Sequence, residues 1–180
     1  FMFLTVLATI STLLLSYLFV VGGWQKLADL AYFQDVITEY HILPASWSPW
    51  LARALPIVEI GAGLALLIPA FQLTALVTVT LLLAGYTFAM ALHITRGRRD
   101  LDCGCAGPGQ EQTISGWLLG RNLVLISLTL LAAPALQQYS LGWAGWAVAL
   151  LGTTVLALLY HIFNQLIANN NLLRRIARHG

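Results

Sequence analysis

The sequence contains very little charge. Only 9% of its 180 residues are charged, nine basic and seven acidic, whereas 59% are hydrophobic. A soluble globular protein has roughly 25% charged residues. A soluble chain with so few charges would expose large apolar patches and aggregate. The composition therefore excludes an ordinary soluble domain and indicates a membrane protein.

Cysteine is equally scarce. The two cysteines, Cys103 and Cys105, are separated only by Gly104. A disulfide-stapled secreted domain would have several pairs at wider spacing, and a closed zinc site would need two further ligands. The basic residues occur in short clusters that suit lipid headgroups better than nucleic acid. What remains is a lone dithiol, whose role must depend on its reactivity.

Five apolar runs approach the roughly 20 residues that a membrane-spanning helix needs. They cover residues 4–21, 54–70, 73–94, 117–135 and 143–163. The first run is too long for the core of a cleaved signal peptide and has no basic start, so we expect it to be a span. The sequence thus predicts an all-α integral membrane protein. Residues 1–180 would form one transmembrane domain, an up-and-down bundle with a four-helix core plus one helix.

The segments around these spans predict amphipathic helices at the membrane surface. Residues 22–51 alternate apolar and charged positions and contain Trp24, Trp47 and Trp50, which suit headgroup depth. The tail, residues 164–180, resembles a second interfacial helix with arginines on its polar side. Small residues should let the spans pack closely; the candidates are Gly61, Ala62, Gly63 and Ala65.

Because consecutive spans alternate in direction, one side of the bundle should collect the chemically active residues. The end of the first span, the start of the second, the end of the third and the start of the fourth meet there. By this count every formal charge lies on or near that side, together with the cysteine loop, residues 95–116. The candidates other than the cysteines are Trp24, Lys26, Glu59, His93 and Arg121.

Glu59 and Arg121 lie inside predicted spans, where an unpaired charge costs several kcal/mol. Pairing with each other, or with Lys26, would offset that cost. Such a pair could simply fix the register of the helices, or it could form a polar pocket that moves protons. His93 ends the third span, a position typical of an interfacial histidine near a helix C-terminus. Alternatively, His93 could assist proton transfer.

The Cys-Gly-Cys segment can form a disulfide only if the backbone turns sharply. Gly104 permits that turn and Gly107 continues the bend. The small ring should be strained and therefore easily reduced. Nearby arginines favour a thiolate, whereas Asp102 opposes it. Two adjacent thiolates could instead bind a soft ion such as Cu(I) or Hg(II) in a transporter or chaperone, or the cysteines could be inert in a membrane assembly subunit.

Three motifs resemble one known family. Gly23-Trp24-Gln25-Lys26-Leu27 closes the first span, residues 56–64 (PIVEIGAGL) open the second, and Asp102-Cys103-Gly104-Cys105-Ala106-Gly107 precedes the fourth. Together they resemble the methylamine-utilisation MauE family within the wider DoxX-like group, over nearly the whole chain. The cysteine motif is the most specific, although the family usually has an aromatic residue where Ala106 stands.

The resemblance implies a membrane thiol–disulfide exchange protein that helps methylamine dehydrogenase mature. Its partners would be a thioredoxin-like protein, MauD, and a disulfide-rich substrate protein. Cys103 and Cys105 would be the catalytic pair, with Glu59, Arg121, Lys26 or His93 supplying protons or charge stabilisation. A quinone lying between helices near the same face could reoxidise the pair.

Two arguments disagree about orientation. All nine basic residues fall on the cysteine side, which by the positive-inside rule places the cysteines in the cytoplasm. The family resemblance implies the bacterial inner membrane with the cysteine loop in the periplasm, where disulfides persist. We expect the periplasmic orientation on the resemblance alone.

Overall fold

The computed structural model describes residues 2–42, 44–97, 116–133 and 142–179, and these residues contain helices and turns but no strand. The long helices are α1 (Met2–Ala28), α3 (Ser48–Ala65), α4 (Gln72–Thr95), α5 (Gly116–Ala132) and α6 (Trp143–His179). A shorter helix, α2 (Leu30–Glu39), and two 3₁₀ turns, η1 (Ala45–Trp47) and η2 (Pro69–Phe71), connect them. The all-α prediction is confirmed.

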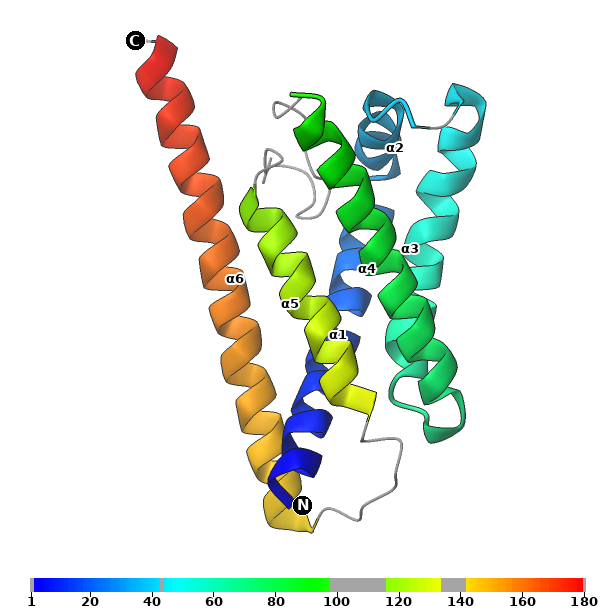
Figure 1. The fold of residues 1–180 in the computed structure, drawn as a ribbon, viewed down its shortest axis with the longest axis vertical. Coiled ribbons are helices and arrows are strands. Elements are labelled where there is room, and N and C mark those ends of the chain that lie inside the picture. Colours follow the sequence, from blue (N-terminus) through cyan, green and yellow to red (C-terminus); the bar gives the residue numbers. More distant parts are fainter. Residues whose placement is uncertain (1, 43, 98–115, 134–141, 180) are drawn as a thin grey trace.

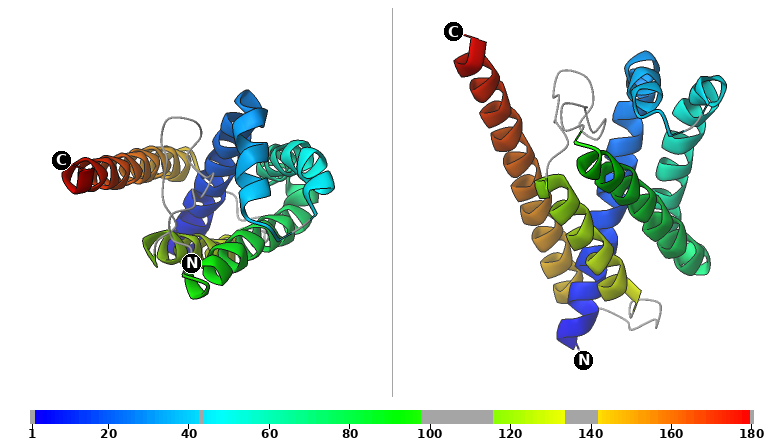
Figure 2. Two further views of the ribbon diagram at one scale, coloured as in Figure 1. Left: turned by 90° about the horizontal axis from the view of Figure 1, so that it is seen from above. Right: turned by 45° about the horizontal axis from the view of Figure 1, so that its top comes forward.

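The five long helices run up and down (Figure 1). α1 packs against α3 and α5, and α4 packs against the same two helices, so the four form a closed ring. α6 packs on the outside of α1 (Figures 1 and 2). This arrangement is the predicted four-helix core with one additional helix.

Three described helices are long and apolar enough to cross a membrane: Phe3–Ala28, Pro69–Thr95 and Trp143–Asn170. α5 is a shorter apolar helix. α3 begins at Ser48, six residues before the predicted span, because Pro49 suits the first turn of a helix. As a result Pro56, expected near the helix start, lies within α3.

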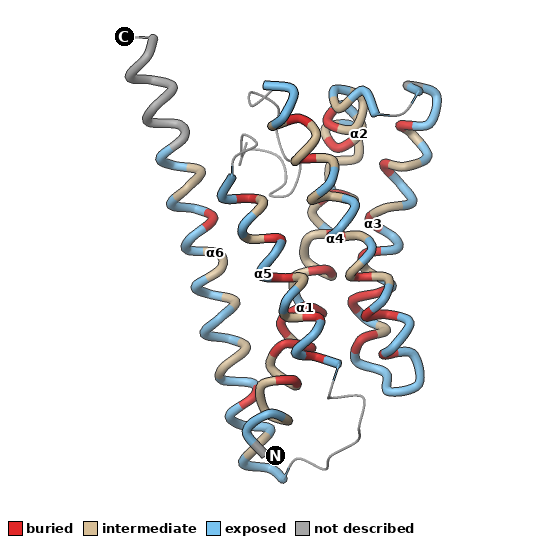
Figure 3. The backbone as a smooth tube through the Cα atoms, in the orientation of Figure 1, coloured by how far each residue is buried: buried red, intermediate tan, exposed pale blue. Residues whose placement is uncertain are grey.

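The core draws on all four helices of the ring. Its buried residues include Leu15 and Phe19 of α1, Ala62 of α3, Val79 of α4 and Leu125 of α5. In Figure 3 the buried positions lie mostly along α1, α3, α4 and α5, whereas the described part of α6 is mostly exposed or intermediate. Many exposed side chains are large and apolar, such as Leu81 and Leu130. In a membrane protein, lipid covers these surfaces.

Glycines allow α1 and α3 to approach closely. A Cβ atom added to Gly63 would lie 3.0 Å from the Ser16 carbonyl oxygen, and one added to Gly23 would lie 2.8 Å from that of Pro56. The Ser16 hydroxyl donates a hydrogen bond to the Gly63 carbonyl at 2.7 Å. Gly63 thus has the predicted packing role, whereas Gly61 does not, because a Cβ there would meet nothing within 4 Å.

α6 differs from the prediction. Residues 143–179 form one continuous helix, not a span followed by a separate interfacial helix. No glycine or proline occurs between Gly152 and Gly180 to interrupt it. Within the bundle, α6 is tied to α1 by a 3.0 Å hydrogen bond between the Tyr17 hydroxyl and His161 Nε2.

α2 lies across the end of the bundle, at the top of Figure 1 and seen lengthwise from above in Figure 2. Asp29 separates it from α1 and caps it, since its carboxylate accepts a hydrogen bond from the Tyr32 backbone N–H at 3.0 Å. Phe33 and Val36 are buried against the bundle. The position agrees with the amphipathic surface segment that the sequence predicts.

Candidate functional site

One end of the bundle holds most of the predicted site residues. The C-terminal ends of α1 and α4, the N-terminal ends of α3 and α5, and the whole of α2 lie there (Figure 1). The two described residues that flank the cysteine segment, Gly97 and Gly116, are also at this end. Asp102, Cys103, Gly104, Cys105 and Gly107 themselves lie outside the described residues.

The centre of this end is a buried ion pair between α1 and α3. Lys26 Nζ lies 2.5 Å from Glu59 Oε1, and the exposed fractions of the two side chains are 9% and 3%. Of the two pairings that the sequence leaves open for Glu59, the structure adopts the one with Lys26. Each charge offsets part of the cost of burying the other.

Tyr86 of α4 completes the cluster. Its hydroxyl donates a hydrogen bond to the same oxygen, Glu59 Oε1, at 2.5 Å. The second oxygen, Oε2, is buried and has no hydrogen-bond partner among the described residues. The carboxylate therefore joins three helices and keeps one oxygen that could accept a proton.

The backbone contact between α1 and α3 explains why this pair forms. Gly23 lies one turn before Lys26, and its position touches Ile60, Pro56 and Glu59 of α3. Without a side chain at Gly23, the two backbones come close enough for the short reach from Lys26 to Glu59. Gly23 and Lys26 belong to the first motif of the sequence, and Pro56 and Glu59 to the second.

Aromatic rings surround the Lys26 ammonium group. It lies 4.7 Å from the centroid of the Tyr86 ring and 5.3 Å from that of Phe33 on α2. Both distances are within the range of cation–π attraction. Lys26 thus connects the surface helix α2 to the bundle as well as α1 to α3.

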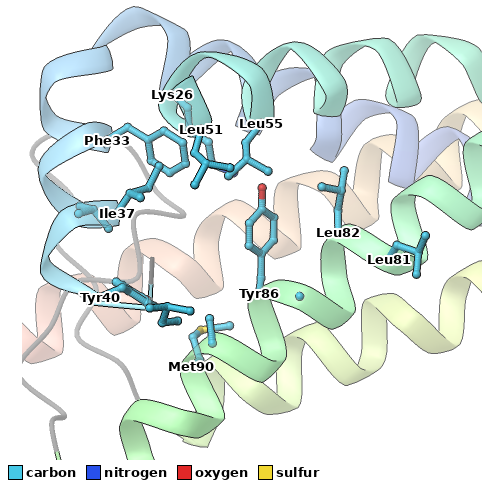
Figure 4. Close-up of a pocket in the computed structure, with 14 residues that line it drawn as sticks. Lys26, Phe33, Ile37, Tyr40, Leu51, Leu55, Leu81, Leu82, Tyr86 and Met90 are labelled. Carbon is cyan, nitrogen blue, oxygen red and sulfur yellow. The ribbon is translucent and has the colours of Figure 1, made fainter. Parts of the chain in front are cut away.

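Next to the ion pair is a cavity of about 290 Å³ between α2, α3 and α4. Figure 4 shows Tyr86 extending from α4 into it, with Phe33 and Ile37 on the α2 side and Leu55 on α3. Most of the lining side chains are aliphatic or aromatic, and Lys26 contributes a charge. Apolar walls with a few converging polar groups are typical of small-molecule sites.

Arg121 lies elsewhere. It contacts α6, where its Nη1 donates a long hydrogen bond of 3.4 Å to Asn164 Oδ1 and its guanidinium lies 5.8 Å from the Tyr160 ring centroid. The Arg121 Nε atom is buried and has no hydrogen-bond partner among the described residues. Arg121 therefore joins α5 to α6 and does not pair with Glu59.

His93 is buried, although its position at the end of a span suggests an interfacial residue. Its side chain is 0% exposed. The ring meets Tyr40 edge to face, with the centroids 4.8 Å apart. Tyr40 directly follows α2, so the end of this surface helix contributes to the burial of the histidine.

The sequence did not identify Tyr86, Tyr160 or Asn164. Tyr86 precedes His93 by seven residues, which places both on one face of α4. A tyrosine hydroxyl in an otherwise apolar span requires a partner, and Glu59 was the available buried acceptor. A tyrosine in one apolar span and a carboxylate in another were therefore the sequence signal for this contact.

The fold and the site define a multi-pass, all-helical membrane protein with a neutralised ion pair beneath a surface helix. The chain belongs to the MauE family, described as "Methylamine utilisation protein MauE", whose model matches residues 4–135. The family resemblance noted in the sequence is therefore confirmed.

Curated relatives agree with this assignment. The chain is 35% identical to methylamine utilization protein MauE of Paracoccus denitrificans over 122 residues, 68% of this chain and 66% of the relative. It is 35% identical to the Paracoccus versutus protein of that name over 147 residues, 81% of this chain and 79% of the relative. For the Methylophilus methylotrophus protein the identity is 28% over 155 residues, 85% and 82% of the two chains. No solved structure matches the chain.

Proposed function

We propose that this chain is a membrane thiol–disulfide exchange protein that acts through Cys103 and Cys105 in methylamine utilisation. Its substrate would be a disulfide-rich protein such as the small subunit of methylamine dehydrogenase, reached through a thioredoxin-like, MauD-like partner. The observation that carries the proposal is the combination of MauE membership with a lone dithiol between Gly97 and Gly116. Gly97 and Gly116, the described residues on either side of this segment in the sequence, lie at the end of the bundle that holds the Lys26–Glu59 pair.

The exchange transfers two electrons. A thiolate of the partner attacks the Cys103–Cys105 disulfide, which forms a mixed disulfide and releases one of the two sulfurs as a thiolate. The partner's second thiolate then attacks the mixed disulfide and releases the other cysteine. The partner leaves as a disulfide and the pair is left as two thiols, having gained two electrons and two protons.

We propose that charged groups at the end of the bundle where α4 ends and α5 begins assist these steps. Glu59 Oε2 is a buried carboxylate oxygen without a hydrogen-bond partner among the described residues, so it could accept a proton. Lys26, Arg121 and His93 supply positive charge or a further proton carrier at the same end of the bundle. Reoxidation of the dithiol requires a two-electron acceptor, and a quinone dissolved in the membrane would become a quinol as the disulfide re-forms.

Thiol trapping tests the proposal. The full chain, purified in detergent, is equilibrated with mixtures of reduced and oxidised glutathione, alkylated and weighed by mass spectrometry. We expect a shift from no added alkyl group to two as the mixture becomes reducing. Cys103→Ser and Cys105→Ser should each abolish oxidation of a thioredoxin-like dithiol protein, and one of them should trap a mixed disulfide.

The alternatives give different results in the same samples. If the chain does not oxidise the dithiol protein and its two cysteines bind Cu(I) or Hg(II) stoichiometrically, the proposal is overturned in favour of metal transfer. Unchanged methylamine dehydrogenase maturation in the Cys103→Ser/Cys105→Ser variant would overturn it in favour of an assembly role.

We further propose that the cysteine segment faces the periplasm of the bacterial inner membrane. Disulfides persist in the periplasm, whereas cytoplasmic reductants keep thiols reduced, and this difference supports the proposed orientation, although positive-inside counting opposes it. A membrane-impermeant maleimide applied to intact spheroplasts should label the reduced pair. Labelling only after the membrane is permeabilised would place the pair in the cytoplasm.

A further inference from the structure

The cavity between α2, α3 and α4 has the features of a ligand site in the membrane. Its volume is about 290 Å³, just below the range of roughly 300–1,000 Å³ that is usual for small-molecule pockets. That space suits one substituted ring and excludes a whole lipid. Two lining residues of α4, Gly85 and Leu81, are exposed, so the cavity is open on the outer side of α4, where lipid would lie.

The walls favour a flat ring. Aromatic side chains lie on different sides of the cavity: Phe33 from α2, Tyr40 after α2 and Tyr86 from α4. Leucines such as Leu55 and Leu82 line the remaining walls (Figure 4). Aromatic pairs prefer stacked or edge-on contacts. A ligand ring in this cavity could make either contact.

The polar end of the cavity determines the charge of the ligand. Lys26 and Tyr86 line it, and both are bonded to Glu59 Oε1. Lys26 has three N–H donors, of which one goes to Glu59. Because Glu59 already neutralises Lys26, an anionic headgroup would leave a net negative charge in a low-dielectric site, which is costly. A neutral carbonyl oxygen could accept a hydrogen bond from Lys26 without that cost.

From these features we infer that the cavity binds the ring of a lipid-soluble quinone. One carbonyl accepts a hydrogen bond from Lys26, the ring lies among the aromatic side chains, and the isoprenoid tail extends past Gly85 into lipid. The inference names an electron acceptor for the proposed thiol exchange, but the binding itself does not require the cysteines.

The test uses the full chain with Cys103→Ser and Cys105→Ser, so that binding is measured without redox chemistry. Decylubiquinone, a quinone with a short tail, is titrated into the protein in dodecylmaltoside micelles and followed by calorimetry. An azido-quinone then marks the site by photocrosslinking and peptide mass spectrometry. We expect saturable binding and crosslinks to α2 and α4.

A pair of glycines provides matched variants. A Cβ added at Gly85 or at Gly61 meets nothing within 4 Å, and leucine has a higher helix propensity than glycine at both positions. Only Gly85 lines the cavity. Gly85→Leu should weaken decylubiquinone binding by at least about tenfold, whereas Gly61→Leu should leave it unchanged.

Three results would overturn the inference: no saturable binding, equal affinity in Gly85→Leu and the parent protein, or displacement of the quinone by lower concentrations of oleate. The last would identify an anionic-lipid site. If Gly85→Leu fails to fold, Ala89→Leu fills the same cavity from the next turn of α4. Because the tested protein lacks both cysteines, failure here leaves the thiol-exchange proposal standing, and failure of thiol trapping leaves this inference standing.

Discussion

The Lys26–Glu59 pair should be the most sensitive polar contact in the bundle. Lys26→Met removes the ammonium group but leaves a carboxylate that is 3% exposed, with only the Tyr86 hydroxyl bonded to it. Removing one partner of a buried pair costs about 3–5 kcal/mol, because the remaining charge stays desolvated. We expect Lys26→Met to lower the free energy of unfolding by an amount near that range.

The double variant Lys26→Met/Glu59→Gln separates the pair from its surroundings. With both charges gone there is no stranded ion, and neutral replacements of buried pairs are often close to neutral in stability. We therefore expect the double variant to be more stable than Lys26→Met alone. The coupling energy from the full cycle, which includes Glu59→Gln, should be about 1–3 kcal/mol.

The measurement is reversible unfolding in mixed micelles of sodium dodecyl sulfate and dodecylmaltoside, followed by circular dichroism. Arg53→Met serves as the control, since Arg53 is an exposed basic residue of the same helix, α3; it should change stability by less than about 0.5 kcal/mol. The reasoning is refuted if Lys26→Met behaves like Arg53→Met. It is also refuted if the two single effects add in the double variant, because additivity means that the charges are not coupled.

The same unfolding assay checks two further predictions. Gly23→Ala should destabilise the bundle by about 1–3 kcal/mol, because its Cβ would lie 2.8 Å from a backbone oxygen of α3. In the neighbouring Gly22→Ala the added Cβ meets nothing within 4 Å, so this variant should be neutral or slightly stabilising. Equal effects at the two glycines would contradict the close packing. Asn164→Leu should cost less than about 1 kcal/mol, since its hydrogen bond with Arg121 is 3.4 Å long and bonds between membrane helices are weak on average; a larger loss would show that this contact holds α6 in place.

The sequence allowed the helices and their directions to be predicted because bilayer thickness sets the length of an apolar run. Boundaries were less accurate where local chemistry extends a helix. Proline at 49 starts α3 early, and a polar stretch rich in asparagine continues α6 because it contains no residue that breaks a helix. Low intrinsic propensity is a weak prior and does not end a helix by itself.

The ion pair could be anticipated in part. A carboxylate inside an apolar span needs a basic partner, and this requirement narrows the choice to Lys26 or Arg121. The choice between them depends on the approach of α1 to α3 at Gly23, which spacing along the chain does not reveal. The cavity was beyond prediction, since α4 is apolar on all sides and an evenly apolar helix does not indicate which face meets a neighbour.

The position of the ion pair is better explained by the cavity beside it than by any contribution of the pair to the stability of the bundle. Helices in lipid have little hydrophobic reason to choose one another and depend on close packing and polar contacts. Gly23, Gly63 and the Ser16 hydrogen bond already bring α1 and α3 together without charge. A buried pair adds little net stability to such a contact. It does hold an ammonium group and a phenol at the edge of an apolar cavity with no net charge between lysine and glutamate, which an all-apolar contact between these helices could not do.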